Sequence, residues 1–283
     1  MPIKNRLAEL LPEIAAWRQD IHTHPELGFE ETRTSGLVAG KLKEFGCDEV
    51  ITGVGGTGVV GVIKGKTDTQ GRVIGLRGDM DALPILEQSG AAYASENPGV
   101  MHACGHDGHT AMLLGAAKYL SETRNFDGTV VLLFQPAEEL GSGAKAMIDD
   151  GVMDRFGVQE VYGMHNAPGI PVGQFAIRPG PIMAATDEFY INVHGRGGHA
   201  AKPHDTIDPT VIASQIILAL QTIVSRNADP VAQGVVSVTS VDSSSHAYNV
   251  IPQSVTLRGT VRTHSAQMQD TIEKRLGELA RGI

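Results

Sequence analysis

The chain is poor in cysteine, in aromatic residues and in long apolar runs. Of its 283 residues only two are cysteines, Cys47 and Cys104, and Phe, Trp and Tyr together make up 5%. A secreted domain built on disulfides uses more cysteine, so that class is excluded. No apolar run approaches the roughly 20 residues of a membrane-spanning helix, and the first twenty residues lack the apolar core of a signal peptide. We therefore predict a soluble, cytoplasmic protein.

Basic residues are also in deficit. The chain has 23 lysines and arginines against 32 aspartates and glutamates, a formal net charge of -9. Nucleic-acid-binding proteins are more often basic, so we expect no nucleic-acid partner. The same balance argues against anionic membrane surfaces. The 41% of hydrophobic residues is typical of a globular protein, and the length is more than one compact core usually contains, so we expect two domains.

The first part of the chain alternates short apolar strands with helices. Strands are expected over residues 58–64, 72–78, 129–135 and 161–165. Helices are expected at the N-terminus and over 37–45, 109–122 and 142–151, the N-terminal one with an apolar face formed by Leu7, Leu10, Leu11, Ile14, Trp17 and Ile21. Buried strands alternating with helices indicate an α/β fold with a mostly parallel sheet, predicted here for residues 1–182.

The pattern changes near residue 183. DEFYINVHGRG alternates in polarity, as a half-exposed antiparallel strand does. A helix follows, capped by Asp208 and running to about Arg226, then two strand-like segments and a helix capped by Ser265. The order predicts a smaller α+β domain over residues 183–283, one strand short of a ferredoxin-like unit.

Polar side chains follow three of the expected strands. Asp79 and Asp81 come after one strand, Glu138 and Glu139 after another, and His165 closes a third. In open α/β sheets, binding sites gather outside the carboxyl ends of the strands. These side chains are therefore expected at one edge of the sheet.

The stretch HACGHDGH, residues 102–109, adds metal-affine side chains at the start of an expected helix. Cys104 and His106 are two residues apart in a glycine-bearing turn, and Cys, His and Glu are the usual ligands of zinc. For an isolated Cys or His we would favour a helix-capping role, but the cluster favours a metal site. A zinc ribbon is excluded because there is no second pair of cysteines. His109 is placed outside the ligand set, and the role of His102 is left open.

The adjacent acids Glu138 and Glu139 could have two different roles. Of Glu138 and Glu139, one carboxylate is able to bind metal while the other takes a proton from a metal-bound water; the alternative is a solvated acidic loop. Asp81 is expected to orient a ligating imidazole, although it could simply form a turn. His22 and His24 are interpreted as polar surface residues of the loop after the first helix.

The second domain offers weaker candidates. His199 lies in the glycine-rich stretch GRGGHAAKPH and could donate to a developing oxyanion, yet an ordinary crossover loop explains the pattern equally well. Asn249 and Arg262 could hold a substrate carboxylate, or be surface residues of strands.

Taken in order, MHACGHDGHTAMLLGAA, FQPAEE, YGMHN, GRGGHAAKPH and YNVIP resemble the M20 metallopeptidase family, in particular its amidohydrolase branch of hippurate and N-acyl-amino-acid hydrolases. The resemblance implies a catalytic domain with two divalent ions, Mn or Zn, and an inserted lid domain that forms a homodimer. The implied reaction is hydrolysis of the amide bond of N-acyl amino acids by a metal-bound hydroxide. The implied ligands are Cys104, His106, Glu139 and His165. Glu138 would be the general base, His199 would polarise the carbonyl, and Asn249 and Arg262 would grip the substrate.

The resemblance also implies elements that this sequence does not contain. Such proteins continue past the lid, return to the catalytic domain and supply a final histidine ligand. We therefore expect residues 1–182 to be an incomplete catalytic domain and residues 183–283 a lid without its last strand. One alternative is a non-catalytic, metal-binding remnant of such an enzyme. Another is thiol catalysis by Cys104 with a histidine base. A zinc deaminase is rejected because its H-x-E and P-C-x-x-C motifs are missing.

Overall fold

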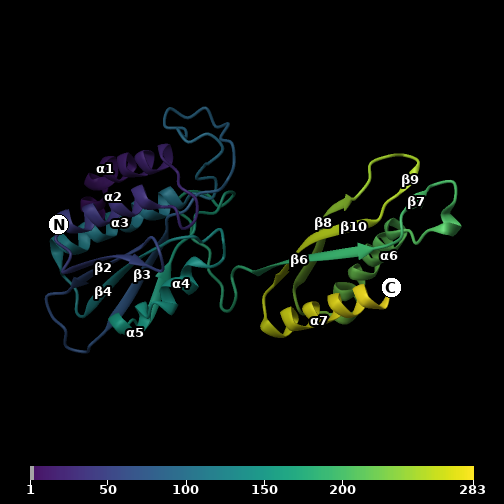
Figure 1. Ribbon diagram of the computed structural model, residues 1–283. Helices are drawn as coiled ribbons and strands as arrows, with labels where there is room; N and C mark the ends of the chain where they lie inside the picture. The colour runs from purple at the N-terminus through teal and green to yellow at the C-terminus, as the bar shows by residue number, and fades with distance from the viewer. Residues whose placement is uncertain (1–2) are drawn as a thin grey trace. The chain divides into compact units, whose positions relative to one another are not determined.

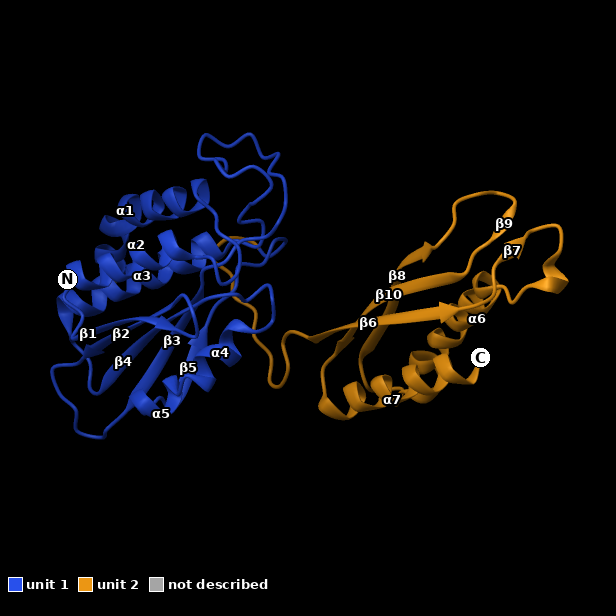
Figure 2. Ribbon diagram, in the orientation of Figure 1, with its two compact units in different colours: residues 1–170 blue, residues 171–283 orange. Residues whose placement is uncertain are grey.

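The computed structural model describes residues 3–283, which fold as two compact units, with the division of the chain between Ile170 and Pro171 (Figure 2). Residues 171–182 contain no helix or strand, and the first strand of the second unit begins at Ala185. The domain boundary predicted at residues 182 and 183 falls just before that strand and stays a prediction.

The first unit is a five-stranded sheet with helices on both faces (Figure 1). Its strands lie in the order β1-β2-β4-β3-β5. The elements are α1 (Ile3–Thr23), α2 (Thr32–Glu44), β1 (Glu49–Val54), β2 (Gly58–Lys64), β3 (Val73–Asp79), α3 (His106–Thr123), β4 (Thr129–Gln135), α4 (Gly143–Asp149), α5 (Val152–Phe156) and β5 (Glu160–Gly163).

The sheet is mixed, so the prediction of a mostly parallel sheet is correct only for one half. β3 pairs in parallel with β4 and β5, whereas β2 pairs antiparallel with both β1 and β4. The cause is a tight reversal between β1 and β2, in which Gly55 and Gly56 take positive φ values of 63° and 102°. Glycine adopts such angles without a steric penalty, so the chain turns straight back into a hairpin. β1 was not predicted from the sequence.

Two apolar layers hold the sheet between its helices. On one face α2 and α3 bury Leu42 and Leu114 against strand residues such as Ile63 and Phe134, and α1 packs along α3. On the other face Met147 of α4 joins residues that include Val131. The predicted apolar face of α1 is partly wrong: the Leu11 side chain is 62% exposed. Because α1 packs against another helix, its buried stripe is narrow and consists of Leu10, Trp17 and Ile21.

Strand register fixes the edge at which the polar residues meet. Asp79, the last residue of β3, lies opposite Gln135, the last residue of β4. β5 runs parallel to them and ends at Gly163, two residues before His165. The chain that precedes α3 also returns to this edge, since His106 bonds to Asp81.

The second unit is an antiparallel sheet in the order β6-β10-β8. Its helices α6 and α7 cover one face and bury residues such as Leu220 and Ile272 against Leu257 of the central strand. The side chains of Asp208 and Ser265 accept the N–H groups of Thr210 and Met268, so both predicted caps are formed. The elements are β6 (Ala185–His194), β7 (Gly198–His199), η1 (Pro203–Asp205), α6 (Pro209–Thr222), η2 (Ile223–Asn227), β8 (Gly234–Ser243), β9 (Val250–Ile251), β10 (Ser254–Thr263) and α7 (Ala266–Gly282).

This unit is therefore a separate α+β unit with an antiparallel sheet, as predicted. Its ferredoxin-like relationship and its role as a lid stay predictions. None of the helices in residues 3–283 combines the length and apolar character needed to cross a bilayer.

Candidate metal centre

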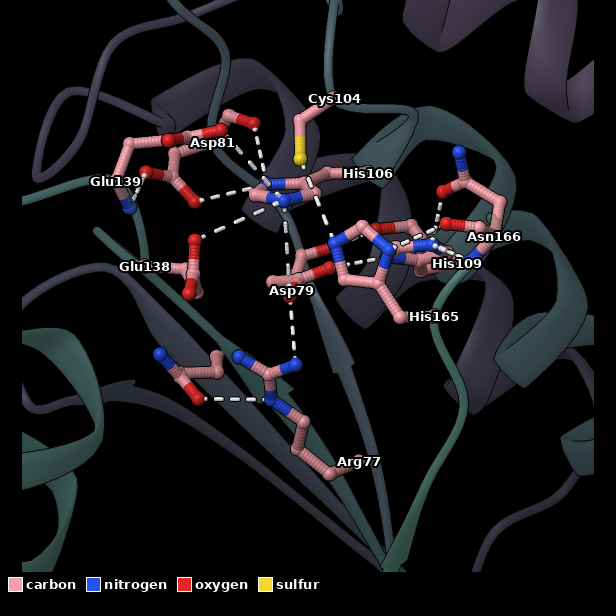
Figure 3. Close-up of polar contacts among 12 residues, drawn as sticks. Arg77, Asp79, Asp81, Cys104, His106, His109, Glu138, Glu139, His165 and Asn166 are labelled. Carbon is pink, nitrogen blue, oxygen red and sulfur yellow. Dashed lines mark hydrogen bonds and ion pairs between the residues drawn. The ribbon is translucent and has the colours of Figure 1, made fainter. Parts of the chain in front are cut away.

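Five of the side chains predicted for the site meet at the carboxyl edge of the first unit's sheet (Figure 3). The Sγ of Cys104 lies 3.4 Å from Nε2 of His165. The Nε2 of His106 lies 3.8 Å from a carboxylate oxygen of Glu138 and, separately, 3.8 Å from one of Glu139. His106 belongs to each of the groups of metal-affine residues at this edge, and is the centre of the cluster.

Asp81 fixes the orientation of His106. The imidazole Nδ1 donates to the backbone carbonyl oxygen of Asp81 at 2.9 Å and lies 3.2 Å from its Oδ1. The other carboxylate oxygen of Asp81 accepts the backbone N–H of Glu139 at 2.9 Å. Asp81 thus aims the Nε2 lone pair of His106 at the two glutamates, the arrangement expected for a residue that orients a metal ligand.

The polar atoms at the centre of this cluster fit a divalent ion. Within the described residues, His106 Nε2 and Glu139 Oε1 are buried and have no hydrogen-bond partner. Burying polar atoms without partners costs free energy, and an ion held between them would remove that cost. Thiolate, imidazole and carboxylate are the donor set of zinc sites and also admit manganese.

Charge and burial act in opposite directions on His106. Burial lowers the pKa of its imidazole, but the hydrogen bond with Asp81 and the charges of Asp79 and Glu139 raise it more, so the net shift is upward. Burial also raises the pKa of Glu139, against the charge of His106. A proton and a metal ion therefore compete for this cluster.

Cys104 and His165 form the second part of the cluster. The Nδ1 of His165 donates to the backbone carbonyl oxygen of Asn166 at 2.7 Å, which leaves Nε2 facing the thiol. Burial raises the pKa of the Cys104 thiol to about 12, and the charges of Glu139 and Glu138 add to the shift. A metal-bound thiol is deprotonated outright, so an ion would displace this proton.

A hydrogen-bonded chain that the sequence analysis missed supports this edge. The Nδ1 of His109 lies 2.6 Å from a carboxylate oxygen of Asp79, and its Nε2 lies 2.5 Å from Oδ1 and 3.1 Å from the backbone N of Asn166. It therefore ties the end of β3 to the segment that bears His165. Burial raises the pKa of Asp79, but the hydrogen bond from His109 and the charge of Arg77 lower it further, to about 2. The available signal was the position of His109, three residues after His106 on one face of α3.

The interpretation of His22 as a polar surface residue is wrong. Its side chain is buried at the end of α1, and Nδ1 lies 2.8 Å from a carboxylate oxygen of Asp107, which also accepts from Arg18 Nε at 2.9 Å. The loop expected to begin before His22 starts after it, because α1 extends to Thr23. His102 is also buried, and burial lowers its pKa to about 4, so its imidazole is neutral.

The second unit places two of its three predicted residues together. His199 of β7 pairs with Val250 of β9, next to Asn249, whose backbone carbonyl accepts the N–H of Ala200 at 2.9 Å. Both side chains are exposed. Arg262 is near the other end of the second unit, in the last part of β10, and donates to its neighbour Thr260. The roles of all three stay predictions.

Comparison with known proteins shows the family of the chain. Residues 75–279 match the model of peptidase family M20/M25/M40. The chain belongs to this family, a family of metal-dependent peptidases and amidohydrolases, and the resemblance found in the sequence is confirmed.

Relatives within the family show what this chain is similar to. It is 47% identical to the hippurate hydrolase of Campylobacter jejuni, over 98% of this chain and 71% of that protein. It is 45% identical to an N-acetyl-L-cysteine deacetylase of Bacillus subtilis, over 95% of this chain and 64% of that protein. Among solved structures, a dinuclear metal binding M20 peptidase of Bacillus subtilis superposes with a TM-score of 0.78 at 39% identity, covering 96% of this chain and 69% of that one.

Proposed function

We propose that this chain hydrolyses the amide bond of N-acyl amino acids with two divalent ions, Mn or Zn, at the candidate metal centre. The observation that supports this most is the convergence of Cys104, His106, Glu139 and His165, with donor atoms of His106 and Glu139 buried and unpartnered. When bound there, such ions polarise a substrate carbonyl and lower the pKa of a coordinated water. The names of the hippurate and N-acetylcysteine relatives support the substrate class.

Glu138 is the general base in this proposal. Its side chain is 38% exposed, against 23% for Glu139, so it is the more accessible of the two carboxylates. Glu139 is held by Asp81 through its backbone N–H and presents a buried oxygen to His106. Glu139 therefore suits a fixed ligand, while Glu138 takes a proton from the attacking water and passes it to the leaving amine.

The second unit contributes substrate recognition. His199 donates to the oxyanion that develops on the substrate carbonyl, and Asn249 beside it binds the carboxylate of the amino acid. Arg262, near the other end of the same unit, would have to reach that carboxylate from a second subunit. The exposure of His199 and Asn249 leaves them accessible to a substrate or to a second subunit. A homodimer formed through this unit is part of the proposal.

The short distance between Cys104 and His165 suggests thiol catalysis as a second candidate function. A nucleophilic cysteine needs a lowered pKa. Here burial and the neighbouring carboxylates raise the thiol pKa to about 12, which disfavours a thiolate in the absence of metal. The geometry therefore favours Cys104 as a ligand.

The test is turnover of hippurate and N-acetyl amino acids by the metal-loaded chain. We expect activity that a chelator abolishes and added Mn or Zn restores. Glu138→Gln should lower kcat by about 10²- to 10⁴-fold while the metal content per chain stays unchanged.

Three results would go against the proposal. Activity that survives the chelator but not thiol alkylation would support thiol catalysis. Unchanged kcat in Glu138→Gln would remove the general base. Metal binding without turnover of any N-acyl amino acid would support a non-catalytic metal-binding role.

A further inference from the structure

The loop between α1 and α2, residues 24–31, contacts both of the acid-bearing turns of the candidate metal centre. The backbone carbonyl of Glu26 accepts the N–H of Ala82, next to Asp81, at 2.8 Å. The carboxylate of Glu31 accepts the N–H of Ala137, next to Glu138, at 2.8 Å. The loop thus joins two turns that lie far apart in the sequence.

Glu31 is a buried acid that the proposed reaction does not use. Its side chain is fully buried, and its second carboxylate oxygen accepts the hydroxyl of Thr57. Burial raises the pKa of Glu31 in spite of these hydrogen bonds. Because burying a carboxyl group costs free energy, we expect Glu31 to have a structural role that compensates for this cost.

The backbone conformation of Ala137, which donates its N–H to Glu31, indicates what this role is. The residue takes a φ of 47°, in the left-handed region that residues with a β-carbon seldom adopt. It is fully buried and immediately precedes Glu138 and Glu139. Gly28 of the same loop packs so closely that a β-carbon there would lie 3.0 Å from the Cα of Ala137. The strained residue is therefore fixed by contacts with the 24–31 loop.

We propose that Glu31 is a positioning residue for Glu138 and Glu139. By accepting the N–H of Ala137 it holds that residue in its left-handed conformation, and so sets the directions in which the two following carboxylates leave the backbone. This inference rests on the proposed function, because it concerns the ligand and the base named there. Glu31 belongs to none of the groups of metal-affine residues found among the described residues.

Glu26 offers a matched control from the same loop. Its carboxylate likewise accepts two hydrogen bonds, in this case from the backbone N–H groups of Arg33 and Thr34 at the start of α2, each at 2.8 Å. Its side chain makes no hydrogen bond to either acid-bearing turn. Glu26→Ala therefore removes two comparable hydrogen bonds without releasing Ala137.

The experiment compares metal affinity, measured by competition with a chromogenic chelator, with kcat and Tm. The metal affinity and kcat of Glu31→Gln should stay within about threefold of the wild-type values, since an amide can accept from Ala137 and donate to Thr57. Glu31→Asp keeps the charge but is one methylene too short, and should lose about 10- to 100-fold in metal affinity, as should Glu31→Ala. Glu26→Ala should lower Tm while its metal affinity stays that of wild type.

Hydrogen exchange at the amides of residues 137–139 gives a readout that needs no metal. Exchange should accelerate in Glu31→Asp and not in Glu26→Ala. The proposal would be overturned if Glu31→Asp had the metal affinity and amide exchange rates of wild type. It would also be overturned if Glu31→Gln lost as much metal affinity as Glu31→Asp. The same holds if Glu26→Ala lost as much metal affinity as Glu31→Ala. If wild-type protein binds metal without hydrolysing N-acyl amino acids, the proposed function fails while the affinity series still decides the role of Glu31. If it binds no metal, the exchange rates decide it.

Discussion

The imidazole of His106 is tied to Asp81 at two points, the backbone carbonyl oxygen at 2.9 Å and the carboxylate Oδ1 at 3.2 Å. This pair connects the turn after β3 to the first residue of α3. Because the second oxygen of Asp81 accepts the N–H of Glu139, one aspartate determines where two proposed ligands lie.

Asp81→Asn should therefore weaken metal binding although Asp81 is not a proposed ligand. An asparagine oxygen can replace only one of the two carboxylate acceptors, and its NH₂ group would then face a donor. We expect metal affinity to fall about 10- to 100-fold with native secondary structure retained. Chelator competition and circular dichroism measure the two quantities. Wild-type affinity in this variant would show that Asp81 only shapes the turn.

Metal affinity should rise with pH, because the Cys104 thiol has a pKa of about 12 and is protonated at neutral pH. Each ion that binds it displaces one proton, so the affinity should increase about tenfold per pH unit between about pH 6.5 and about pH 8. The raised pKa of His106 acts in the same direction at the acidic end. Cys104→Ser should lower the slope by about one proton, and Cys47→Ser should keep it. An affinity independent of pH would argue against thiolate ligation.

Glu31→Gln should stabilise the protein more at neutral than at acidic pH. The pKa of Glu31 is raised in the folded chain, so its contribution to stability is fully present below the unfolded pKa of about 4.3 and is lost as the pH rises through the folded value. Near pH 7 the ionised buried group therefore costs stability that glutamine does not. Denaturant titrations at acidic and neutral pH compare the free energy of unfolding of the two proteins. A difference that does not grow with pH would contradict the raised pKa.

Gly28→Ala should disturb the site through the backbone. Its new β-carbon would lie 3.0 Å from the Cα of Ala137 and equally close to Leu140, so the turn before Glu138 must move by a few tenths of an ångström. We expect a loss of about 1–3 kcal/mol in stability, together with lower kcat and metal affinity. Gly36→Ala, in α2 with no atom within 4 Å of the added carbon, is the control and should stabilise by about 0.5–1 kcal/mol. If the two variants had the same stability, kcat and metal affinity, the contact between Gly28 and Ala137 would not affect the metal centre.

Much of the first unit was predictable because its strands are short and almost wholly apolar. β2 and β4 have the predicted bounds, and the acids that follow the strands do meet at one edge. The direction of β2 was not predicted because β1 was not recognised as a strand. Only three residues separate β1 from β2, and a connection that short allows an antiparallel hairpin but no parallel crossover.

The supporting residues of the site were harder to infer. Glu31, His109 and Asn166 act through hydrogen bonds to groups far away in the sequence, and no local spacing indicates those partners. His22 looks like a loop residue until α1 is known to continue past it. Proposed ligands could be recognised by their chemical type, whereas the residues that hold them are defined only by the fold.

The proposed ligands Cys104 and His165 are 61 residues apart and come from different segments of the first unit. In an unfolded chain they would rarely meet, so tight binding of an ion requires the native sheet. Mass action then makes the ion a selective stabiliser of the folded form, worth about 2.7 kcal/mol at a hundredfold excess over its Kd. Limiting metal supply in a cell would thus leave less of this protein folded, and its lifetime as well as its chemistry would follow the metal level.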